Sequence, residues 1–503
     1  MLSSGTFMAY LVLALLIDAR ALPRSDLLRR PAWAYAVSLF ALTLLFAVWF
    51  APSGRPAFAA ISALITLAIV VHISNLKYRD VLEPVNFMDF TLTPQIWRHP
   101  RLYRAEFLRH WVFWVGVLLL LGVIALWFAW IEISVLRHPD RWTPLIAMSL
   151  ATAIMVYLVF AGPLPETIVS AIHARLMPPD PARDVSVLGF AGATLAGVIA
   201  WRRHAEVSRS WPVMPPANEQ PSPLVIVVQA ESFVDLARIG LRDVSLPGLA
   251  EARAKSALHG PLTVPVQGAW TLRCEYSFLT GLPLQVFGMD ALHPYWRLRH
   301  PPRTIAHHLR DHGFRTAFVH PFDIAFFNRE TAMPKLGFQR LIGEEAFADT
   351  AREGYYVPDL AVADRVLELV ASEHAPLFCM AATMENHNPW GRGRIAGIDD
   401  PVDQYVYHLR NTDRMIARLI AGIEAQPRPA VFAFYGDHVP TLHELAEPFP
   451  DTRTDYVVMG WRDGTWLPGG KTGDLSLGQL AGTILDVLQQ VRAGTVERQP
   501  AGA

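Results

Sequence analysis

The sequence predicts an N-terminal bundle of membrane-spanning α-helices followed by an α/β domain built on a mainly parallel central sheet. Apolar residues make up 52% of the 503-residue chain and charged residues only 18%, and the long apolar stretches are concentrated before residue 165. A proline-rich stretch, PVMPPANEQPSP, separates them from a second half with the composition of a soluble domain. In that half, short runs of continuous apolar residues alternate with helical patterns, which is typical of buried parallel strands.

The first half contains apolar stretches near the length that a helix needs to cross a bilayer core, which is about 20 residues. They are residues 7–17, 33–50, 58–73, 111–131 and 144–161. They predict a transmembrane domain over residues 1–165 with about five helices. The first stretch is short and ends at Asp18. Because it lacks a basic leading segment and a small-residue cleavage site, we expect a retained anchor and not a signal peptide.

A further apolar segment, residues 185–201, lies in the juxtamembrane segment and linker at residues 166–221. It is short and rich in glycine, so a sixth membrane helix and a helix lying at the interface both fit it. Basic residues concentrate in the loops after the first and third stretches, which the positive-inside rule places in the cytoplasm. Five passes would leave the C-terminal half in the cytoplasm, whereas six would place it outside.

The second domain, residues 222–495, carries the apolar runs that predict the sheet. They are LVIVVQA (224–230), TAFVH (316–320), PLFCMAAT (376–383), AVFAFYG (430–436) and DYVVMGW (455–461). Helical patterns at residues 358–372 and 403–426 lie between them. This alternation predicts parallel strands with helices on both faces of the sheet.

Polar residues stand at the ends of four of these runs. Glu231 follows the first run, His320 ends the second, His387 comes shortly after the third, and Asp437 and His438 follow the fourth. The carboxyl ends of parallel strands meet at one edge of a sheet, so we expect these side chains to converge there. Taken singly, a glutamate or histidine after a strand is more often a cap or a hydrogen-bonded loop residue. Asp437 and His438 together, however, offer oxygen and nitrogen donors suited to Zn²⁺ or Mn²⁺.

The stretch VQGAWTLRCEYSFLTGLP, residues 266–283, places Thr271 and Glu275 close together between two apolar, glycine-bounded segments. Two interpretations are open from the residues alone. Thr271 is a nucleophile, or the Thr-x-x-x-Glu pattern begins an ordinary capped helix.

After the membrane stretches, the motifs VVQAESF, GAWTLRCEYSFLTGLP, HPFDIAFFNR, MENHNPW and FYGDH follow one another in that order. This arrangement resembles the lipoteichoic-acid synthase type of phosphoglycerol transferase, within the alkaline-phosphatase and sulfatase superfamily. The resemblance covers the whole chain in layout and residues 222 to about 490 in motif. It implies that residues 222–495 form a sulfatase-like catalytic domain. The implied reaction is metal-dependent transfer of a phosphoglycerol group from phosphatidylglycerol to an envelope glycan or polymer.

The resemblance also implies the site residues. The implied ligands of one divalent metal, Mn²⁺ foremost with Mg²⁺ or Zn²⁺ as alternatives, are Glu231, Thr271, Asp437 and His438. Thr271 is the implied catalytic nucleophile, which forms a covalent phosphothreonine, because a bound dication lowers the pKa of a hydroxyl. The implied substrate-binding residues are His320, Phe327, Arg329 and His387. Phe327 stands where better-known members carry tryptophan, which leaves the identity of the head group open.

Several alternatives remain beside this interpretation. A phosphoethanolamine transferase and a sulfatase-fold phosphodiesterase share the fold. A true sulfatase is disfavoured because Cys274 leads into Glu-Tyr-Ser-Phe and not into the x-Pro-x-Arg of the sulfatase maturation signal. An alternative from another class is a non-catalytic membrane protein that binds a lipid or glycan, which has no need of Thr271.

The implied donor and acceptors determine the expected location. Phosphatidylglycerol and envelope glycans meet at the outer face of the bacterial cytoplasmic (inner) membrane, so we expect a multi-pass protein with its catalytic domain on the periplasmic or extracellular side. The net charge of −1 and the lack of a basic cluster interleaved with aromatic residues exclude a nucleic-acid partner. Cys274 and Cys379 show neither a disulfide framework nor metal-type spacing.

Two further segments have two interpretations each. Residues 293–315 are rich in arginine and histidine; they either shape an acceptor groove or form a helix at 304–312 with a basic, solvated face. Residues 74–90 either lie on the membrane and touch the lipid donor or have no such role.

Overall fold

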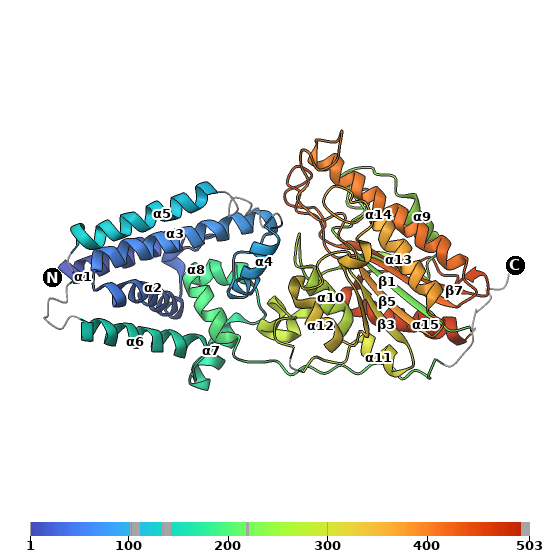
Figure 1. Ribbon diagram of the computed structural model, residues 1–503. Coiled ribbons are helices and arrows are strands. Elements are labelled where there is room, and N and C mark those ends of the chain that lie inside the picture. Colours follow the sequence, from blue (N-terminus) through green and yellow to red (C-terminus); the bar gives the residue numbers. More distant parts are fainter. Residues whose placement is uncertain are drawn as a thin grey trace. The chain divides into compact units, whose positions relative to one another are not determined.

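The computed structural model describes residues 2–100, 102, 111–132, 134, 142–217, 221–298 and 300–493 (Figure 1). The chain divides into two compact units. Unit 1 comprises Met1–Ala205 and Gly288–Leu292, and unit 2 comprises Glu206–Phe287 and His293–Ala503.

Unit 1 is helical throughout its described part. Its elements are α1 (Leu2–Asp18), η1 (Leu27–Arg29), α2 (Ala32–Ser53), α3 (Pro56–Val81), η2 (Phe87–Leu92), α4 (Thr93–Arg98), α5 (Trp111–Leu126), the π-helical turn η4 (Trp127–Ile131), α6 (Trp142–Phe160), α7 (Glu166–Leu176) and α8 (Pro181–Ala200). Helices α2, α3, α6 and α8 are long and apolar enough to cross a membrane, whereas α1 and α5 are shorter apolar helices. The expectation of an apolar N-terminal helical bundle is therefore confirmed.

Helix α8, which contains the apolar segment at residues 185–201, is interrupted at Gly189, where φ is +74°. The buried carboxylate of Asp18 caps the second half of the helix, because it accepts a hydrogen bond from the backbone N–H of Ala191 at 2.7 Å. The Arg30 guanidinium donates to the other Asp18 oxygen at 3.0 Å. The break thus leaves no uncapped helix start inside the apolar bundle.

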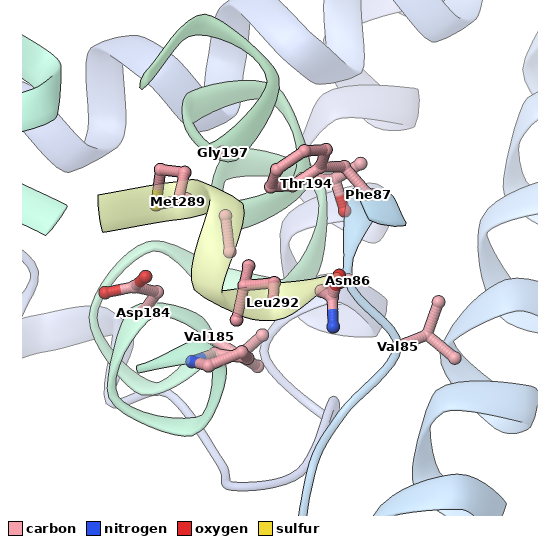
Figure 2. A pocket seen from close by; sticks show the side chains of 11 residues that line it. Val85, Asn86, Phe87, Asp184, Val185, Thr194, Gly197, Met289 and Leu292 are labelled. Atoms are coloured by element: carbon pink, nitrogen blue, oxygen red, sulfur yellow. The ribbon is translucent and has the colours of Figure 1, made fainter. Parts of the chain in front are cut away.

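A small pocket lies beside this broken helix in unit 1 (Figure 2). Its walls come from the segment that leads into η2, from α8 and from residues 288–292. Most of the lining is apolar, and Asn86, Asp184 and Thr194 supply polar groups.

The segment at residues 74–90 contains the end of α3 and the start of η2, and it folds back on itself. The Lys77 ammonium donates to the Glu83 carboxylate at 3.2 Å and to the Asp89 carboxylate at 2.8 Å. Three of the charged side chains of this segment therefore pair with one another.

Unit 2 is an α/β domain. Its strands are β1 (Leu224–Ala230), β2 (Leu258–Thr263), β3 (Arg315–Val319), β4 (Arg340–Ile342), β5 (Leu377–Ala382), β6 (Ala430–Gly436), β7 (Thr454–Arg462), β8 (Thr465–Trp466), β9 (Lys471–Thr472) and β10 (Leu475–Ser476). Its helices are α9 (Pro247–Lys255), α10 (Thr271–Thr280), η5 (Leu284–Leu292), α11 (Ile305–Asp311), η6 (Phe326–Asn328), α12 (Arg329–Lys335), η7 (Glu344–Phe347), α13 (Asp359–Ser372), α14 (Pro401–Glu424) and α15 (Leu477–Ala493), although the end of η5 belongs to unit 1.

The sheet is mainly parallel, as the sequence predicts. Its strand order is β10-β2-β7-β6-β1-β5-β3-β4, and the pairs from β6 through β4 are parallel. The expectation that the run at residues 455–461 is a parallel strand is wrong, because β7 runs antiparallel to both β6 and β2. A parallel return needs a long crossover, usually a helix, and no helix lies between β6 and β7. Strand β2 did not stand out in the sequence, since its LHGPLT contains a glycine and a proline.

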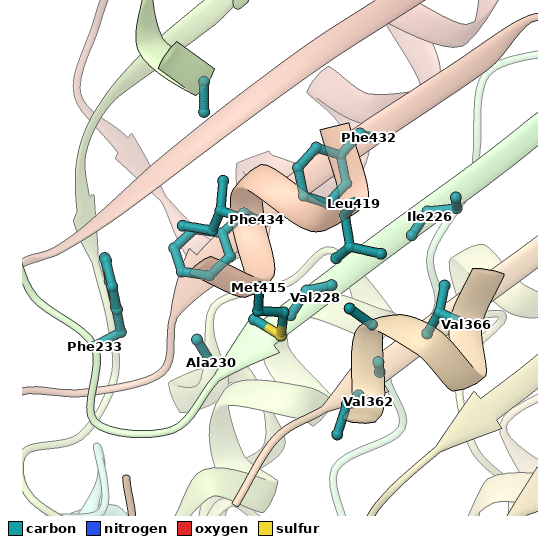
Figure 3. Close-up of a cluster of buried hydrophobic side chains, with 14 of the residues drawn as sticks. Ile226, Val228, Ala230, Phe233, Val362, Val366, Met415, Leu419, Phe432 and Phe434 are labelled. Carbon is teal, nitrogen blue, oxygen red and sulfur yellow. The ribbon is translucent and has the colours of Figure 1, made fainter. Parts of the chain in front are cut away.

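Both faces of the central strands are buried, which explains their continuous apolar runs. On one face, side chains such as Ile226, Val228 and Phe434 pack against α13 and α14 (Figure 3). The alternate side chains point to the other face, where the Tyr435 ring lies 5.4 Å from the ring of Phe278 on α10. Helix α10 is therefore held against the sheet, with every one of its residues buried.

Candidate active site

The site lies where β1 and β6 end. The two strands pair in parallel with Ala230 opposite Gly436, so the residues that follow them, Glu231 and Asp437, emerge side by side. Gly436 is needed here, because a Cβ at this position would lie 1.9 Å from the carbonyl oxygen of Phe233. The strand register therefore brings two buried carboxylates to one edge of the sheet.

Glu231, Asp437 and His438 form a group whose ligand atoms all lie within 4.8 Å of one another. The Nε2 atom of His438 is 3.6 Å from a Glu231 oxygen and 3.5 Å from Oδ2 of Asp437. Nδ1 of His438 lies 3.0 Å from the carbonyl oxygen of Val439, so it is the nitrogen that donates, and Nε2 keeps its lone pair.

The donor set fits a divalent cation. Oδ2 of Asp437 and Nε2 of His438 are buried and have no hydrogen-bond partner among the residues that the structure describes. Such orphaned buried atoms are rare unless a ligand satisfies them. Burial, and then the neighbouring Glu231 carboxylate, raise the pKa of Asp437 to about 7. Two carboxylates and an imidazole with a free lone pair are ligands that Mn²⁺ and Zn²⁺ accept.

Thr271 is the first residue of α10, and its hydroxyl adjoins this group. Its Oγ1 donates to Oε2 of Glu231 at 3.3 Å. The preceding residue, Trp270, adopts a left-handed conformation with φ of +71°, which turns the chain sharply into the helix. The structure therefore brings together the implied nucleophile and the three other implied metal ligands.

Behind Thr271, one helical turn along α10, Glu275 forms a buried ion pair with Arg329. The Arg329 Nε atom lies 3.1 Å from both carboxylate oxygens, and Nη2 lies 2.5 Å from Oε1. The Tyr295 hydroxyl donates to Oε2 at 2.9 Å. One edge of the Arg329 guanidinium is thus engaged by Glu275, so its Nη1 atom is the part that faces the other site residues.

The Nε2 atom of His320 lies 3.3 Å from Nη1 of Arg329. Its Nδ1 lies 3.0 Å from the carbonyl oxygen of Ala382, so Nδ1 donates and Nε2 accepts from Arg329. Burial, and then the Arg329 charge, lower the pKa of His320 well below its usual value. The imidazole is therefore neutral at neutral pH.

The remaining implied head-group residues, Phe327 and His387, lie at the same edge. The Phe327 ring stacks on the Trp270 ring at 6.1 Å and lies 5.3 Å from the Arg329 guanidinium carbon. Nδ1 of His387 is 2.7 Å from the carbonyl oxygen of Asn388. Burial lowers the pKa of His387 to about 4.

The structure also shows contributors that sequence reasoning missed. Tyr295, which contacts Glu275, belongs to the segment at residues 293–315, for which an acceptor groove is one of the two interpretations. Arg394 donates to the carbonyl oxygens of Glu385 and His387 and so holds the loop after β5. Its position six residues beyond the MENHN motif was the only available signal.

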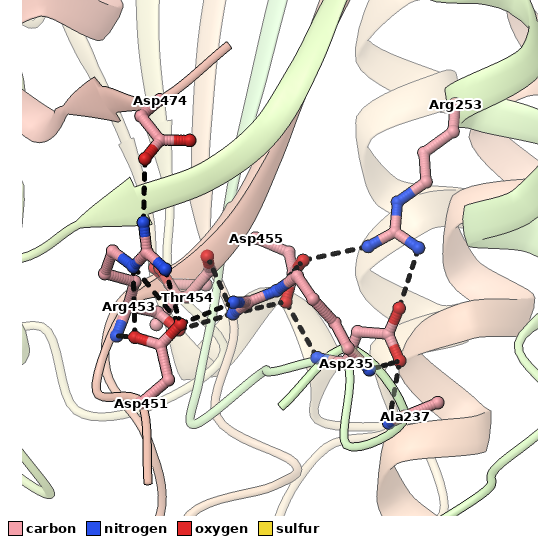
Figure 4. Close-up of polar contacts among 10 residues, drawn as sticks. Asp235, Ala237, Arg253, Asp451, Arg453, Thr454, Asp455 and Asp474 are labelled. Atoms are coloured by element: carbon pink, nitrogen blue, oxygen red, sulfur yellow. Dashed lines mark hydrogen bonds and ion pairs between the residues drawn. The ribbon is translucent and has the colours of Figure 1, made fainter. Parts of the chain in front are cut away.

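A network of ion pairs supports the loop that carries Glu231 (Figure 4). The Asp455 carboxylate at the start of β7 accepts from the backbone N–H of Asp235 at 2.8 Å. Arg238 and Arg253 both donate to the other Asp455 oxygen at 2.8 Å. The adjacent Thr454 hydroxyl donates to the Gly436 carbonyl at 2.7 Å. The start of β7 therefore anchors both loops that supply the candidate metal ligands.

Comparisons with known proteins agree with this description. Residues 223–490 match the family model described as Sulfatase. The chain is 33% identical over 431 residues to "Capsular polysaccharide biosynthesis protein RkpI" of Rhizobium meliloti (strain 1021), covering 83% of this chain and 80% of that protein. It is 25% identical over 451 residues to a "Putative cyclic beta-1,2-glucan modification protein" of the same organism, covering 83% and 68%.

Among solved structures, the chain is similar to the "Integral membrane protein lipooligosaccharide phosphoethanolamine transferase A (EptA) from Neisseria meningitidis". The TM-score is 0.55 at 13% identity, and the match covers 96% of this chain and 94% of that one. This likeness concerns the fold, and it extends over the helical unit as well as the α/β unit.

Proposed function

Because the chain belongs to the sulfatase family, within the alkaline-phosphatase superfamily, we propose that it is a membrane-anchored phosphoglycerol transferase. The proposed donor is phosphatidylglycerol, and the proposed acceptor is a hydroxyl of an envelope glycan or polymer. The observation that carries the proposal is the contact between the Thr271 hydroxyl and the buried group of Glu231, Asp437 and His438. The names of the two relatives, which refer to capsular polysaccharide biosynthesis and cyclic glucan modification, support a carbohydrate acceptor.

Glu231, Thr271, Asp437 and His438 would hold a divalent ion, with Mn²⁺ as our first choice, and this ion would supply the positive charge that makes a hydroxyl acidic. In the first step, the Thr271 oxygen bonds to phosphorus, the bond to the diacylglycerol oxygen breaks, and phosphoglycerol stays on Thr271. The threonine proton leaves along its existing hydrogen bond to Glu231.

In the second step, an acceptor hydroxyl attacks the same phosphorus and Thr271 departs. The diacylglycerol oxygen released in the first step takes up the proton that Thr271 gave to Glu231, and the proton of the acceptor hydroxyl restores the Thr271 hydroxyl in the second step. Arg329 Nη1 and the neutral imidazoles of His320 and His387 are proposed to bind the phosphoglycerol group.

Incubation of the purified full-length protein with labelled phosphatidylglycerol and Mn²⁺ tests this proposal. We expect diacylglycerol release, loss of release with a chelator, and a phosphoglycerol mass increment on the peptide that contains Thr271. Thr271→Ala should lose both signals, whereas Thr271→Ser should keep the labelled peptide. Intact lipid after incubation would instead identify a binding protein.

A parallel incubation with labelled phosphatidylethanolamine addresses the second candidate, a phosphoethanolamine transferase. This candidate is kept because the solved structure with the same fold over nearly the whole chain has that activity in its name. Among the described residues, one group of side chains is arranged to hold a metal, and we therefore favour phosphoglycerol over the more zinc-rich phosphoethanolamine enzymes. Faster cleavage of phosphatidylethanolamine would reverse that preference.

The proposed donor and acceptor place the catalytic unit on the periplasmic or extracellular side of the inner membrane. An alkaline-phosphatase reporter fused after Ala503 should be active there. Activity of a reporter that works only in the cytoplasm would contradict this orientation.

A further inference from the structure

A cluster of aromatic rings adjoins the candidate nucleophile. The cluster consists of Trp270, His293, Trp296 and Phe327. The His293 imidazole stands edge-on to the other three rings, with centroid distances of 6.4 Å to Trp270 and 6.1 Å to both Phe327 and Trp296. Trp270 is bonded to Thr271, so the cluster begins one residue, or about 3.8 Å between Cα atoms, from the reacting side chain.

The backbone around this cluster is strained. Among the described non-glycine residues, six have positive φ, and three of these are Trp270, Phe327 and Asn328. A positive φ on a bulky side chain costs of order 1–3 kcal/mol and is found mainly at functional sites. Two of these strained residues, Trp270 and Phe327, carry rings of the cluster.

The cluster differs from an ordinary core in its exposure and its polar atoms. The Trp296 side chain is 48% exposed, and Phe327 is half-buried. The Arg273 guanidinium covers the Trp270 ring at 4.2 Å. Nδ1 of the buried His293 has no hydrogen-bond partner among the described residues. Burial, and then Arg273, lower the pKa of His293 to about 4, so the imidazole is neutral at neutral pH.

We propose that Trp296, backed by His293, Trp270 and Phe327, is the acceptor subsite, and that its occupant is a sugar ring of a carbohydrate acceptor. This inference rests on the proposed function and names the residues that would hold its second substrate. A sugar ring has an apolar face of C–H bonds, which are attracted to the negative face of an aromatic ring, and a rim of hydroxyls that need polar partners. The cluster offers both kinds of contact.

Other occupants fit less well. A lipid acyl chain would leave Nδ1 of the His293 imidazole without a hydrogen-bond partner, which is costly in an apolar contact. The phosphoglycerol group is proposed to bind near His320 and Arg329. Trp296 lies further away, because Phe327 is the neighbour of Arg329, His293 is the neighbour of Phe327, and Trp296 is the neighbour of His293. A sugar on Trp296 can therefore be present while the phosphoglycerol group is on Thr271.

The test uses the full-length protein in phosphatidylglycerol vesicles with a β-1,2-linked glucan as the carbohydrate probe. Trp296→Ala should raise the dissociation constant for the glucan about tenfold, which corresponds to ~1.4 kcal/mol. Trp296→Phe, which keeps a ring, should recover most of that loss. Diacylglycerol release measured without glucan should stay within about twofold of wild type, since the donor binds elsewhere. Leu360→Ala, an exposed apolar residue on α13, is the matched control and should change neither quantity.

Glucan binding is measured by calorimetry on the Thr271→Ala variant, so it does not depend on turnover. No glucan binding, or equal binding with and without the Trp296→Ala change, would overturn the subsite. A Trp296→Ala variant that slows diacylglycerol release while binding glucan normally would assign the cluster to the lipid and also overturn it. Failure of the wild type to release any diacylglycerol would instead defeat the proposed function, and the binding measurement would still decide the subsite.

Discussion

Replacing Glu275 by glutamine should destabilise the protein far more than a surface substitution does. The Glu275 and Arg329 side chains are 0% and 1% exposed, and the pair is joined by hydrogen bonds from Nε and Nη2. Glu275→Gln keeps the shape of the side chain but removes its charge. Arg329 is then left as a buried cation without its partner.

The expected loss in the free energy of unfolding is about 3–5 kcal/mol, the usual cost of removing one partner of a buried ion pair. At roughly 2–4 °C per kcal/mol for a domain of this size, the unfolding temperature should fall by about 10 °C. Replacing both residues by methionine removes the unpaired charge, so the double variant Glu275→Met/Arg329→Met should be much closer to wild type in stability. It should nevertheless be inactive, because Arg329 is a proposed phosphate ligand.

Thermal unfolding of the full-length protein in detergent, followed by tryptophan fluorescence, measures these differences. The control is Asp403→Asn, which breaks the exposed pair between Arg242 and Asp403 and should cost about 0–1 kcal/mol. If Glu275→Gln unfolds at the same temperature as Asp403→Asn, the reasoning is refuted. A double variant less stable than the single one would refute it as well.

Three further outcomes are expected. Asp455→Asn should weaken Mn²⁺ binding, measured by calorimetry, about tenfold, because it loosens the loop that carries Glu231. Burial raises the pKa of Glu385 from 4.5 to about 7, so the stability it contributes is present below pH 4.5 and is lost as the pH rises through about 7. The unfolding free energy of the wild type, relative to that of Glu385→Gln, should therefore fall by about 3 kcal/mol between pH 4.5 and 8. Thermal melts recorded across that range measure this change. Gly189→Ala should destabilise unit 1 by about 3 kcal/mol or more in thermal melts, since its Cβ would lie 1.8 Å from an Asp18 oxygen.

Each of these outcomes has its own control. Asp474→Asn lies at the exposed end of the ion-pair network and should leave Mn²⁺ affinity unchanged, so equal losses in both variants would contradict a positioning role. A pH-independent difference between wild type and Glu385→Gln would mean that Glu385 does not titrate in this range. A Cβ at Gly122 on α5 would meet no other atom within 4 Å, so Gly122→Ala should leave the unfolding temperature unchanged. If Gly189→Ala changes the unfolding temperature no more than Gly122→Ala does, the steric argument is wrong.

Local patterns in the sequence predicted individual elements of the fold correctly. The runs at residues 224–230 and 430–436 coincide with β1 and β6, because strands buried on both faces leave an uninterrupted apolar pattern. The predicted helix at residues 304–312 corresponds to α11, which Thr304 caps. Its expected basic, solvated face is partly wrong, since His308 on that helix is buried.

Long-range relationships were not readable in the same way. The antiparallel direction of β7 left no trace in its composition, because an apolar strand buried on both faces has the same pattern in either direction. Glu275 and Arg329 are 54 positions apart in the chain, so no local sequence pattern predicts that they form a buried ion pair. The capping of the broken helix α8 by Asp18 involves residues 173 positions apart and was equally hidden.

The order of apolar stretches and motifs was enough to establish a helical membrane unit, an α/β unit of the sulfatase family and the chemical types of the candidate site residues. Those properties depend on local hydrophobicity and on the donor atoms of individual side chains, which can be read directly from the sequence. The folded structure decided three other properties: which nitrogen of His438 keeps its lone pair, which edge of Arg329 faces the site, and which rings surround His293. Hydrogen bonds and electrostatic interactions vary steeply with distance and burial, and folding sets both for residues that are remote along the chain.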